Sequence, residues 1–193
     1  MKTIGMISVM LATLAVAPGC TVERKSDDAP LPAPAASSAP ADDPTVLRCA
    51  DDDLTDSIAF SGPGWDGTTK RPIKEPRPTY TIATTVFAYH RDEKRKAEFE
   101  ATLSRFVEAA KLSPGLVGYQ IARSAKCGYA RTISVWETED AMMGFVLSGA
   151  HSDAMTKVRD VGIDGRTIHW EGPAKELPLS WPAARAKLVP TLP

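Results

Sequence analysis

Three histidines, at positions 90, 151 and 169, are the side chains of this chain best suited to exchange a proton near neutral pH. His151 follows Gly149, where a helical pattern breaks, so its ring is expected to point into the space between a helix and a sheet. Because an imidazole titrates at a pH of about 6.5, His151 is the candidate catalytic base. The alternative is structural, with the ring bonded to a backbone carbonyl that the break leaves free.

Four further side chains are candidates for binding a substrate: Trp136, Phe145, Tyr119 and Arg131. Trp136 and Phe145 could form the apolar wall of a pocket, while Tyr119 and Arg131 could reach a polar group of the substrate. Each also has a structural explanation, because a tryptophan at a strand end commonly packs in the core and paired hairpin residues commonly point outward. A cofactor-free oxygenase needs a closed apolar pocket, a base and groups that orient the substrate.

Other chemistries are disfavoured by the pattern of residues. The three histidines include no close pair and the chain has no Cys-x-x-Cys sequence, so no metal site is expected. The chain has no Gly-x-Ser-x-Gly sequence and no dinucleotide-binding fingerprint, which disfavours hydrolysis and nicotinamide chemistry. The charges nearly balance, with 23 Lys and Arg against 24 Asp and Glu, so nucleic acid is not an expected partner.

The elements that position these residues are predicted from hydrophobic periodicity. Residues 79–89 are rich in β-branched and aromatic side chains, and they predict a central strand that is covered on both faces. Asp92 predicts a helix N-cap, and the apolar spacing from Phe99 to Ala110 predicts a helix that ends at residues 113–115.

The second half of the domain is predicted to begin with two strands, at residues 116–123 and 129–136. A capped helix at residues 138–160, a turn at residues 162–165 and a last strand at residues 166–170 follow. The order of elements is therefore β-α-β-β-α-β. This order is typical of a ferredoxin-like α+β fold, in which two helices cover one face of an antiparallel sheet. The fold alone leaves the function open.

The segment Ile133–Ala141 (ISVWETEDA), followed by Phe145 and His151, is similar to the dimeric α+β-barrel proteins related to the antibiotic biosynthesis monooxygenases. It also resembles the spheroidene monooxygenases of carotenoid synthesis. The sequences at residues 116–119 and 177–183 fit the same resemblance. The resemblance implies a homodimer whose sheets pair across a two-fold axis, and a monooxygenase-like activity such as cofactor-free oxygenation of aromatic compounds.

Haem degradation is another activity of the superfamily, but its histidine has no counterpart here. Haem-degrading members carry a histidine on the second helix after an aromatic residue. Phe145 holds the aromatic position, whereas the position ten residues further on is Met155, and His151 lies a turn earlier. Haem is therefore disfavoured, no haem ligand is assigned, and no cofactor is expected.

The N-terminal residues predict export. An uncharged apolar run at residues 4–17 is too short to cross a bilayer as a helix, so it reads as a secretory signal. Residues 16–20 (VAPGC) resemble the lipobox of bacterial lipoproteins, which implies a signal peptide at residues 1–19, a lipidated Cys20 carrying palmitate and a membrane partner. Thr21, in place of Asp, implies a lipid anchor in the outer membrane facing the periplasm. The alternative is an ordinary signal peptide that leaves the cysteine free.

Residues 20–44 have almost no large apolar side chain and are rich in Pro and Ala, which predicts a disordered tether. Residues 45–78 are dense in Gly and Pro and predict an irregular strap over a domain at residues 79–188. With the first cysteine lipidated, Cys49 and Cys127 could pair in an oxidising compartment, closing a loop of 127 − 49 = 78 positions. The alternative is two separate buried thiols.

Two functions from different classes fit these patterns. One is an envelope-anchored enzyme that oxygenates or binds a small apolar or aromatic compound, with His151 as base or orienting group. The other is a non-catalytic binding or structural lipoprotein built on the same dimeric barrel. A pocket lined by Trp136, Phe145 and His151 with a route to solvent would favour the enzyme, whereas a pocket filled by Met142, Met143 and Met155 would favour the second function.

Overall fold

A five-stranded antiparallel sheet with the strand order β1-β5-β6-β4-β7 is the centre of the fold. The computed structural model describes residues 47–49 and 53–192. Strands β2 and β3 form a separate two-stranded ribbon. The helices and strands are β1 (Thr55–Ser61), β2 (Trp65–Asp66), β3 (Arg71–Pro72), β4 (Thr79–Tyr89), α1 (Glu93–Lys111), β5 (Leu116–Ser124), β6 (Tyr129–Trp136), α2 (Glu139–Val146), α3 (Gly149–Val161), β7 (Gly162–Pro173) and α4 (Trp181–Leu188).

The predicted ferredoxin-like α+β arrangement is confirmed by the connections and the strand order. Strands β4, β5, β6 and β7 with their intervening helices follow the β-α-β-β-α-β order, and they lie in the spatial order β7-β4-β6-β5. The bounds of β4 are the predicted residues 79–89. The chain adds β1 to this core, as an edge strand beside β5.

The helices begin at the residues whose side chains can accept hydrogen bonds from free backbone N–H groups. The Asp92 carboxylate accepts a bond from the Arg95 N–H at 3.0 Å, and this bond lowers the pKa of Asp92. Thr138 caps α2 through a 3.1 Å bond from the Ala141 N–H. The break predicted at Gly149 lies just before it, at Leu147 and Ser148, and Ser148 supplies the N-cap from which α3 begins.

The predicted turn at residues 162–165 is wrong, because these residues are the first part of β7. A β-carbon added to Gly162 would lie 2.2 Å from the Phe87 ring, so the glycine lets the last strand approach β4 closely. Gly162 therefore allows close packing within the sheet, and the sequence pattern mistakes it for a turn residue.

The strap at residues 45–78 is more regular than predicted, since it contains β1 and the β2–β3 ribbon. β1 pairs with β5 through two register shifts, which explains why its alternation of apolar residues is weak. Phe60 of β1 lies over Gly118 of β5, where an added β-carbon would come within 2.7 Å of its ring. Phe60 also meets Trp65 edge to face, with ring centroids 4.9 Å apart.

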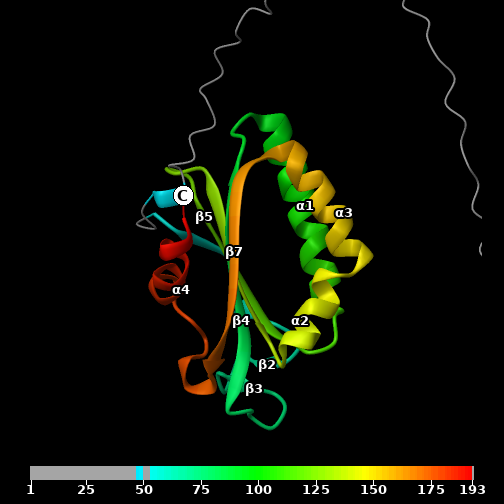
Figure 1. The fold of residues 1–193 in the computed structure, drawn as a ribbon, viewed down its shortest axis with the longest axis vertical. Helices are drawn as coiled ribbons and strands as arrows, with labels where there is room; N and C mark the ends of the chain where they lie inside the picture. Colours follow the sequence, from blue (N-terminus) through cyan, green and yellow to red (C-terminus); the bar gives the residue numbers. More distant parts are fainter. Residues whose placement is uncertain (1–46, 50–52, 193) are drawn as a thin grey trace, which may run out of the picture. The chain divides into compact units, whose positions relative to one another are not determined.

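The two faces of the sheet are covered by different parts of the chain (Figure 1). Helices α1, α2 and α3 cover one face, which we call the helix face. Helix α4 and the residues around Leu47 cover the other, which we call the tail face. Leu188 of α4 and Leu47 are both 1% exposed in the core of the tail face.

The predicted signal peptide, the lipidated Cys20 and the tether at residues 20–44 lie outside the described residues. Within residues 47–49 and 53–192, none of the helices combines the length and the apolar character needed to cross a bilayer.

Candidate functional site

Four small side chains form the middle of the helix face. The pairing of β4 with β6 places Ala83 opposite Ser134 and Thr85 opposite Thr132. All four residues are half-buried, although they belong to β4 and β6, two of the three inner strands of the sheet. Ile82, which points to the tail face from the same strand, is 0% exposed. These four residues therefore keep some solvent exposure beneath the helices, and we call them the trough.

Aromatic stacks at both ends of the trough hold the helices away from the sheet. At one end, Trp136 of β6 stacks on Phe145 of α2, with ring centroids 5.4 Å apart. At the other end, Phe99 of α1 stacks on Phe87 and Tyr89 of β4 at 5.4 and 4.7 Å. Because these rings are much larger than the Ala, Ser and Thr side chains between them, the helices cannot close onto the floor of the trough.

His151 lies on the first turn of α3, in contact with aromatic rings of the other two helices. Its ring centroid is 5.6 Å from that of Phe106 and 5.5 Å from that of Phe145. Burial lowers the pKa of His151 below its ordinary value, because the charged ring is poorly solvated there. No described residue offers its ring a hydrogen bond, and the helix break is satisfied instead by the Ser148 hydroxyl, which accepts from the His151 N–H at 3.3 Å.

The predicted binding residues are divided between the two faces. Tyr119 and Trp136 point to the helix face, where they are 8% and 2% exposed, and Phe145 packs with them. The Trp136 Nε1–H donates to the Ser134 hydroxyl at 3.0 Å, so it is tied to the floor of the trough. Arg131 is fully buried in the tail face, where its guanidinium carbon lies 5.8 Å from the centroid of the Trp181 ring. The structure therefore brings Tyr119, Trp136 and Phe145 into one cluster, which His151 contacts through Phe145, and it places Arg131 elsewhere.

The methionines near this site are partly in the core and partly at the surface. Met142 is 5% exposed and packs in the same cluster as Trp136 and Phe145, whereas Met155 is 45% exposed. Trp136 and Phe145 thus fill the end of the trough as a packed wall. The small, partly exposed residues of β4 and β6 lie beside this wall.

A polar pocket of about 450 Å³ opens where β6 turns into α2, and we call it the mouth pocket. Thr81, His169 and Glu171 are among its lining residues. In the sheet, Thr81 pairs with Trp136 on one side and with Glu171 on the other, and His169 pairs with Ala83. Since directly paired residues share a face, Thr81 and His169 of the mouth pocket are neighbours of the trough residues on the helix face.

The three acidic side chains that line the mouth pocket each have a partner. The Glu139 carboxylate lies 3.2 Å from His169 Nε2, and the Glu137 carboxylate lies 2.5 Å from Lys74 Nζ. The Thr79 hydroxyl donates to the Glu171 carboxylate. In the part of the chain that the structure describes, no three His, Cys, Asp or Glu side chains are grouped so that they could hold a metal ion.

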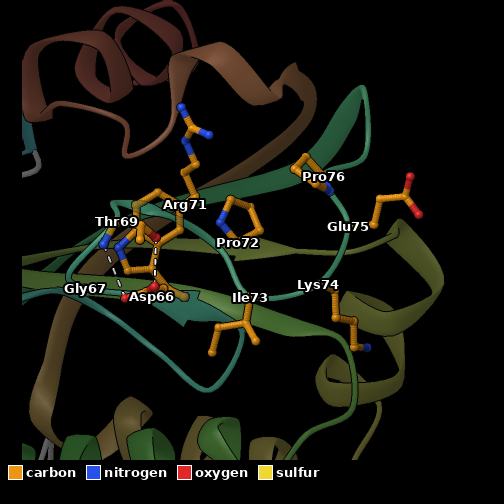
Figure 2. A pocket seen from close by; sticks show the side chains of 10 residues that line it. Asp66, Gly67, Thr69, Arg71, Pro72, Ile73, Lys74, Glu75 and Pro76 are labelled. Carbon is orange, nitrogen blue, oxygen red and sulfur yellow. Dashed lines mark hydrogen bonds between the residues drawn. The ribbon is translucent and has the colours of Figure 1, made fainter.

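A second, larger pocket of about 880 Å³ lies on the β2–β3 ribbon and the residues after it (Figure 2). Its charged side chains Arg71, Lys74 and Glu75 point in different directions in Figure 2. Asp66 bonds within its own turn, accepting from the Thr68 N–H at 2.8 Å. Because no polar groups converge here, we do not place the functional site in this pocket.

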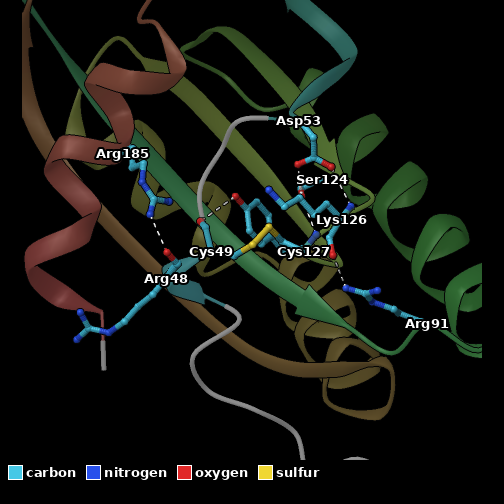
Figure 3. The surroundings of a disulfide bond; sticks show 9 residues. Arg48, Cys49, Asp53, Arg91, Ser124, Lys126, Cys127 and Arg185 are labelled. Atoms are coloured by element: carbon cyan, nitrogen blue, oxygen red, sulfur yellow. Dashed lines mark hydrogen bonds between the residues drawn. A yellow bond between two sulfur atoms is a disulfide. The ribbon is translucent and has the colours of Figure 1, made fainter.

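The start of the strap is attached to the domain by a disulfide between Cys49 and Cys127, whose Cα atoms are 5.9 Å apart (Figure 3). Asp53 holds the same turn, because its carboxylate accepts from the Ser124 hydroxyl at 2.5 Å and from the Lys126 N–H at 2.8 Å. These bonds, the one from Ser124 first, lower the pKa of Asp53. The disulfide and the carboxylate together tie the strap to the β5–β6 turn.

Comparisons with known proteins give one family and several structural likenesses. Residues 79–169 match the model of a family described as a domain of unknown function (DUF3291). No curated protein matches the chain. Similar solved structures include a mutant of SnoaB, a cofactor-independent oxygenase from Streptomyces nogalater, with 21% identity over 54% of this chain and 100% of that chain and a TM-score of 0.42.

Two further structures are similar to a comparable extent. An antibiotic biosynthesis monooxygenase has 12% identity, covering 47% of this chain and 95% of that chain, with a TM-score of 0.42. A protein of unknown function from Nitrosomonas europaea, NE2512, has 10% identity, covering 54% of this chain and 100% of that chain, with a TM-score of 0.44. The fold class stated above rests on the strand order and connections of this chain itself.

Proposed function

We propose that the domain binds a small, flat apolar or aromatic compound that carries a hydroxyl or carbonyl group. The supporting observation is the partial solvent exposure of the trough floor, formed by Ala83, Thr85, Thr132 and Ser134 beneath the helices. The aromatic stacks at its ends offer flat apolar contacts, and the floor hydroxyls offer a few polar ones. Sites for small molecules usually combine these two kinds of lining.

The reaction class that we propose is cofactor-free oxygenation. A base removes a proton from a hydroxylated aromatic ring, and the electron-rich anion then donates electrons to dioxygen. The resemblance of residues 133–151 to the antibiotic biosynthesis monooxygenases supports this class. His151 is the base or orienting group predicted from the sequence, and its lowered pKa leaves it neutral at pH 7 and able to accept a proton.

The second candidate is a binding protein without catalysis. It is favoured by the packing at the end of the trough, where Trp136, Phe145 and Met142 are each at most 5% exposed. Dioxygen uptake with hydroxylated naphthalenes separates the two functions, because a binding protein consumes none. Turnover that is unchanged in His151→Ala would exclude this residue as the base.

We also propose that the chain is anchored in the bacterial cell envelope through a lipid on Cys20, in the outer membrane facing the periplasm. The lipobox-like sequence at residues 16–20 supports this location, and the Cys49–Cys127 disulfide suits an oxidising compartment. Metabolic labelling with palmitate in a Gram-negative host should label the full chain and not the Cys20→Ser variant. Equal labelling of both would overturn the proposed anchor.

Binding in the trough is tested with 2-naphthol as the probe and the methyl groups of alanine as reporters. Ala83 lies on the floor of the trough, whereas Ala88 lies on the tail face of the same strand and is 0% exposed. We expect 2-naphthol to shift the NMR signal of the Ala83 methyl and not that of Ala88. At roughly 0.4 kcal/mol for each of about 11 heavy atoms, the expected Kd is on the order of 0.6 mM.

A matched pair of substitutions locates the bound probe. Ala83→Leu fills the floor of the trough and should abolish the binding of 2-naphthol, as followed by the methyl signal of Thr85. Ala150→Leu adds the same atoms at an exposed position of α3 and should leave the affinity unchanged. Equal affinities of the two variants would show that the probe does not enter the trough.

A further inference from the structure

His169 and Glu139 form a histidine–carboxylate pair in the mouth pocket. His169 projects from β7 and Glu139 from the first turn of α2, and the Nε2 to Oε1 distance is 3.2 Å. An ionised carboxylate can only accept hydrogen bonds, so the neutral imidazole must carry its proton on Nε2. Its Nδ1 atom then holds a lone pair and can accept a proton or a hydrogen bond.

The other carboxylates around this histidine have partners of their own. Glu171, on the same strand, accepts from the Thr79 hydroxyl, and Glu137 pairs with Lys74 at 2.5 Å. Arg77 lines the pocket from the segment before β4. Glu139 is therefore the carboxylate placed to orient the His169 ring and to stabilise it when it becomes charged.

His169 is also next to the floor of the trough. The register of β7 on β4 places it directly opposite Ala83, and Ala83 is in turn opposite Ser134. The His169 side chain is 44% exposed, so a molecule that enters from solvent can reach it. The ring of His151, by contrast, contacts Phe106 and Phe145, and its side chain has no carboxylate partner among the described residues.

We propose that His169 accepts the hydroxyl proton of the bound compound, and that Glu139 is its positioning residue. This inference rests on the proposed function, and it assigns the ligand to phenols and enols. The aromatic part of the ligand lies over Ala83 and Ser134, and its hydroxyl meets Nδ1 of His169. In the transfer, the ligand O–H bond breaks, an N–H bond forms at Nδ1, and the resulting imidazolium faces the Glu139 carboxylate. In this assignment His169 replaces His151 as the base, and His151 belongs to the wall of the trough.

The tautomer of His169 is the first test, because only a ring protonated on Nε2 leaves Nδ1 able to accept the proton of the ligand. In spectra that correlate ring protons with ring nitrogens at alkaline pH, we expect His169 to carry its proton on Nε2. Glu139→Ala should produce a mixture of tautomers. Addition of 2-naphthol should shift the Nδ1 signal of His169 and leave both nitrogen signals of His90 unchanged. A ring protonated on Nδ1, or a shift confined to His151, would overturn the assignment.

Affinity is the second test. His169→Ala removes the acceptor and should weaken the binding of 2-naphthol about five- to tenfold, the value of one hydrogen bond. His90→Gln, at the opposite end of β4, is the control and should bind as the parent does. If the Ala83 methyl signal of the parent protein does not respond to the probe, the proposed function fails together with this inference. If it responds but His169→Ala binds equally well, only the role of His169 is refuted.

Discussion

Reduction of the Cys49–Cys127 disulfide should destabilise the domain mainly because the unfolded chain gains conformational entropy when the cross-link is removed. The bond closes a loop of 78 positions. The chain-entropy relation then gives a loss of about 15 cal/mol/K in the unfolded chain, or about 4.5 kcal/mol at 25 °C. In a domain of this size, each kcal/mol of lost stability lowers Tm by about 3 °C, so Tm should decrease by about 13 °C.

The native state should survive reduction, because other contacts hold the same segment. Leu47 is 1% exposed in the tail face, and the Asp53 carboxylate keeps its two bonds to the β5–β6 turn. The Tyr129 hydroxyl also donates to the Cys49 carbonyl oxygen at 3.3 Å. Near-UV circular dichroism of the reduced protein should therefore match that of the oxidised protein below the unfolding transition.

Urea denaturation of the oxidised and reduced protein tests this reasoning without any change of sequence. The denaturant m-value should rise on reduction, because an unlinked chain exposes more surface when it unfolds. The control is the double variant Cys49→Ala/Cys127→Ala, whose stability should not respond to the reducing agent. A loss below about 1 kcal/mol, or a large loss with an unchanged m-value, would refute the entropic account.

Three further predictions concern single side chains. Trp181→Phe removes the 2.8 Å bond from Nε1–H to the Asp56 carboxylate and should lower the free energy of unfolding in urea by about 1–2 kcal/mol; an unchanged midpoint would contradict this. Thr138→Ala removes the N-cap of α2 and should cost about 1 kcal/mol in the same assay, whereas Thr138→Ser should cost little. The pKa of His151 is lowered in the folded protein, so the unfolded chain binds the proton first and stability should decline as the pH falls below about 6.5. His151→Phe should flatten this decline between pH 7 and pH 5, and an unchanged pH dependence would show that His151 does not cause it.

The elements with strong periodicity could be predicted from the sequence, whereas those held by distant contacts could not. The strand at residues 79–89 and the caps Asp92 and Thr138 are local signals, and the structure confirms them. Helix α4 has eight residues, too few to be stable alone, and it forms because Leu188 packs against the tail face. β1 likewise depends on pairing with β5 and has irregular register.

The site was only partly predictable for a related reason. The residues named from the sequence include the wall of the trough, Trp136 and Phe145, because large rings at element ends are conspicuous. The floor residues Ala83 and Ser134 look like ordinary strand positions, and their role depends on how far the helices stand from the sheet. The sequence alone could have assigned Arg131 and Trp136 to opposite faces of the sheet, since residues an odd number of positions apart on one strand point to opposite faces.

Sheet-to-sheet pairing of two copies, the homodimer implied by the resemblance, would require a bare tail face. In this chain, Leu47, Leu179 and Leu188 cover that face and are 1%, 6% and 1% exposed. Exposing each leucine costs roughly 1.5–3 kcal/mol, so releasing the three would cost about 5–9 kcal/mol before a partner could dock.

The homodimer stays a prediction, and we expect its interface to leave α4 in place. The long edge strand β7 offers unpaired backbone groups for such an interface. Native mass spectrometry combined with hydrogen exchange tests this expectation: a dimer whose α4 amides lose protection would show that the partner displaces the tail.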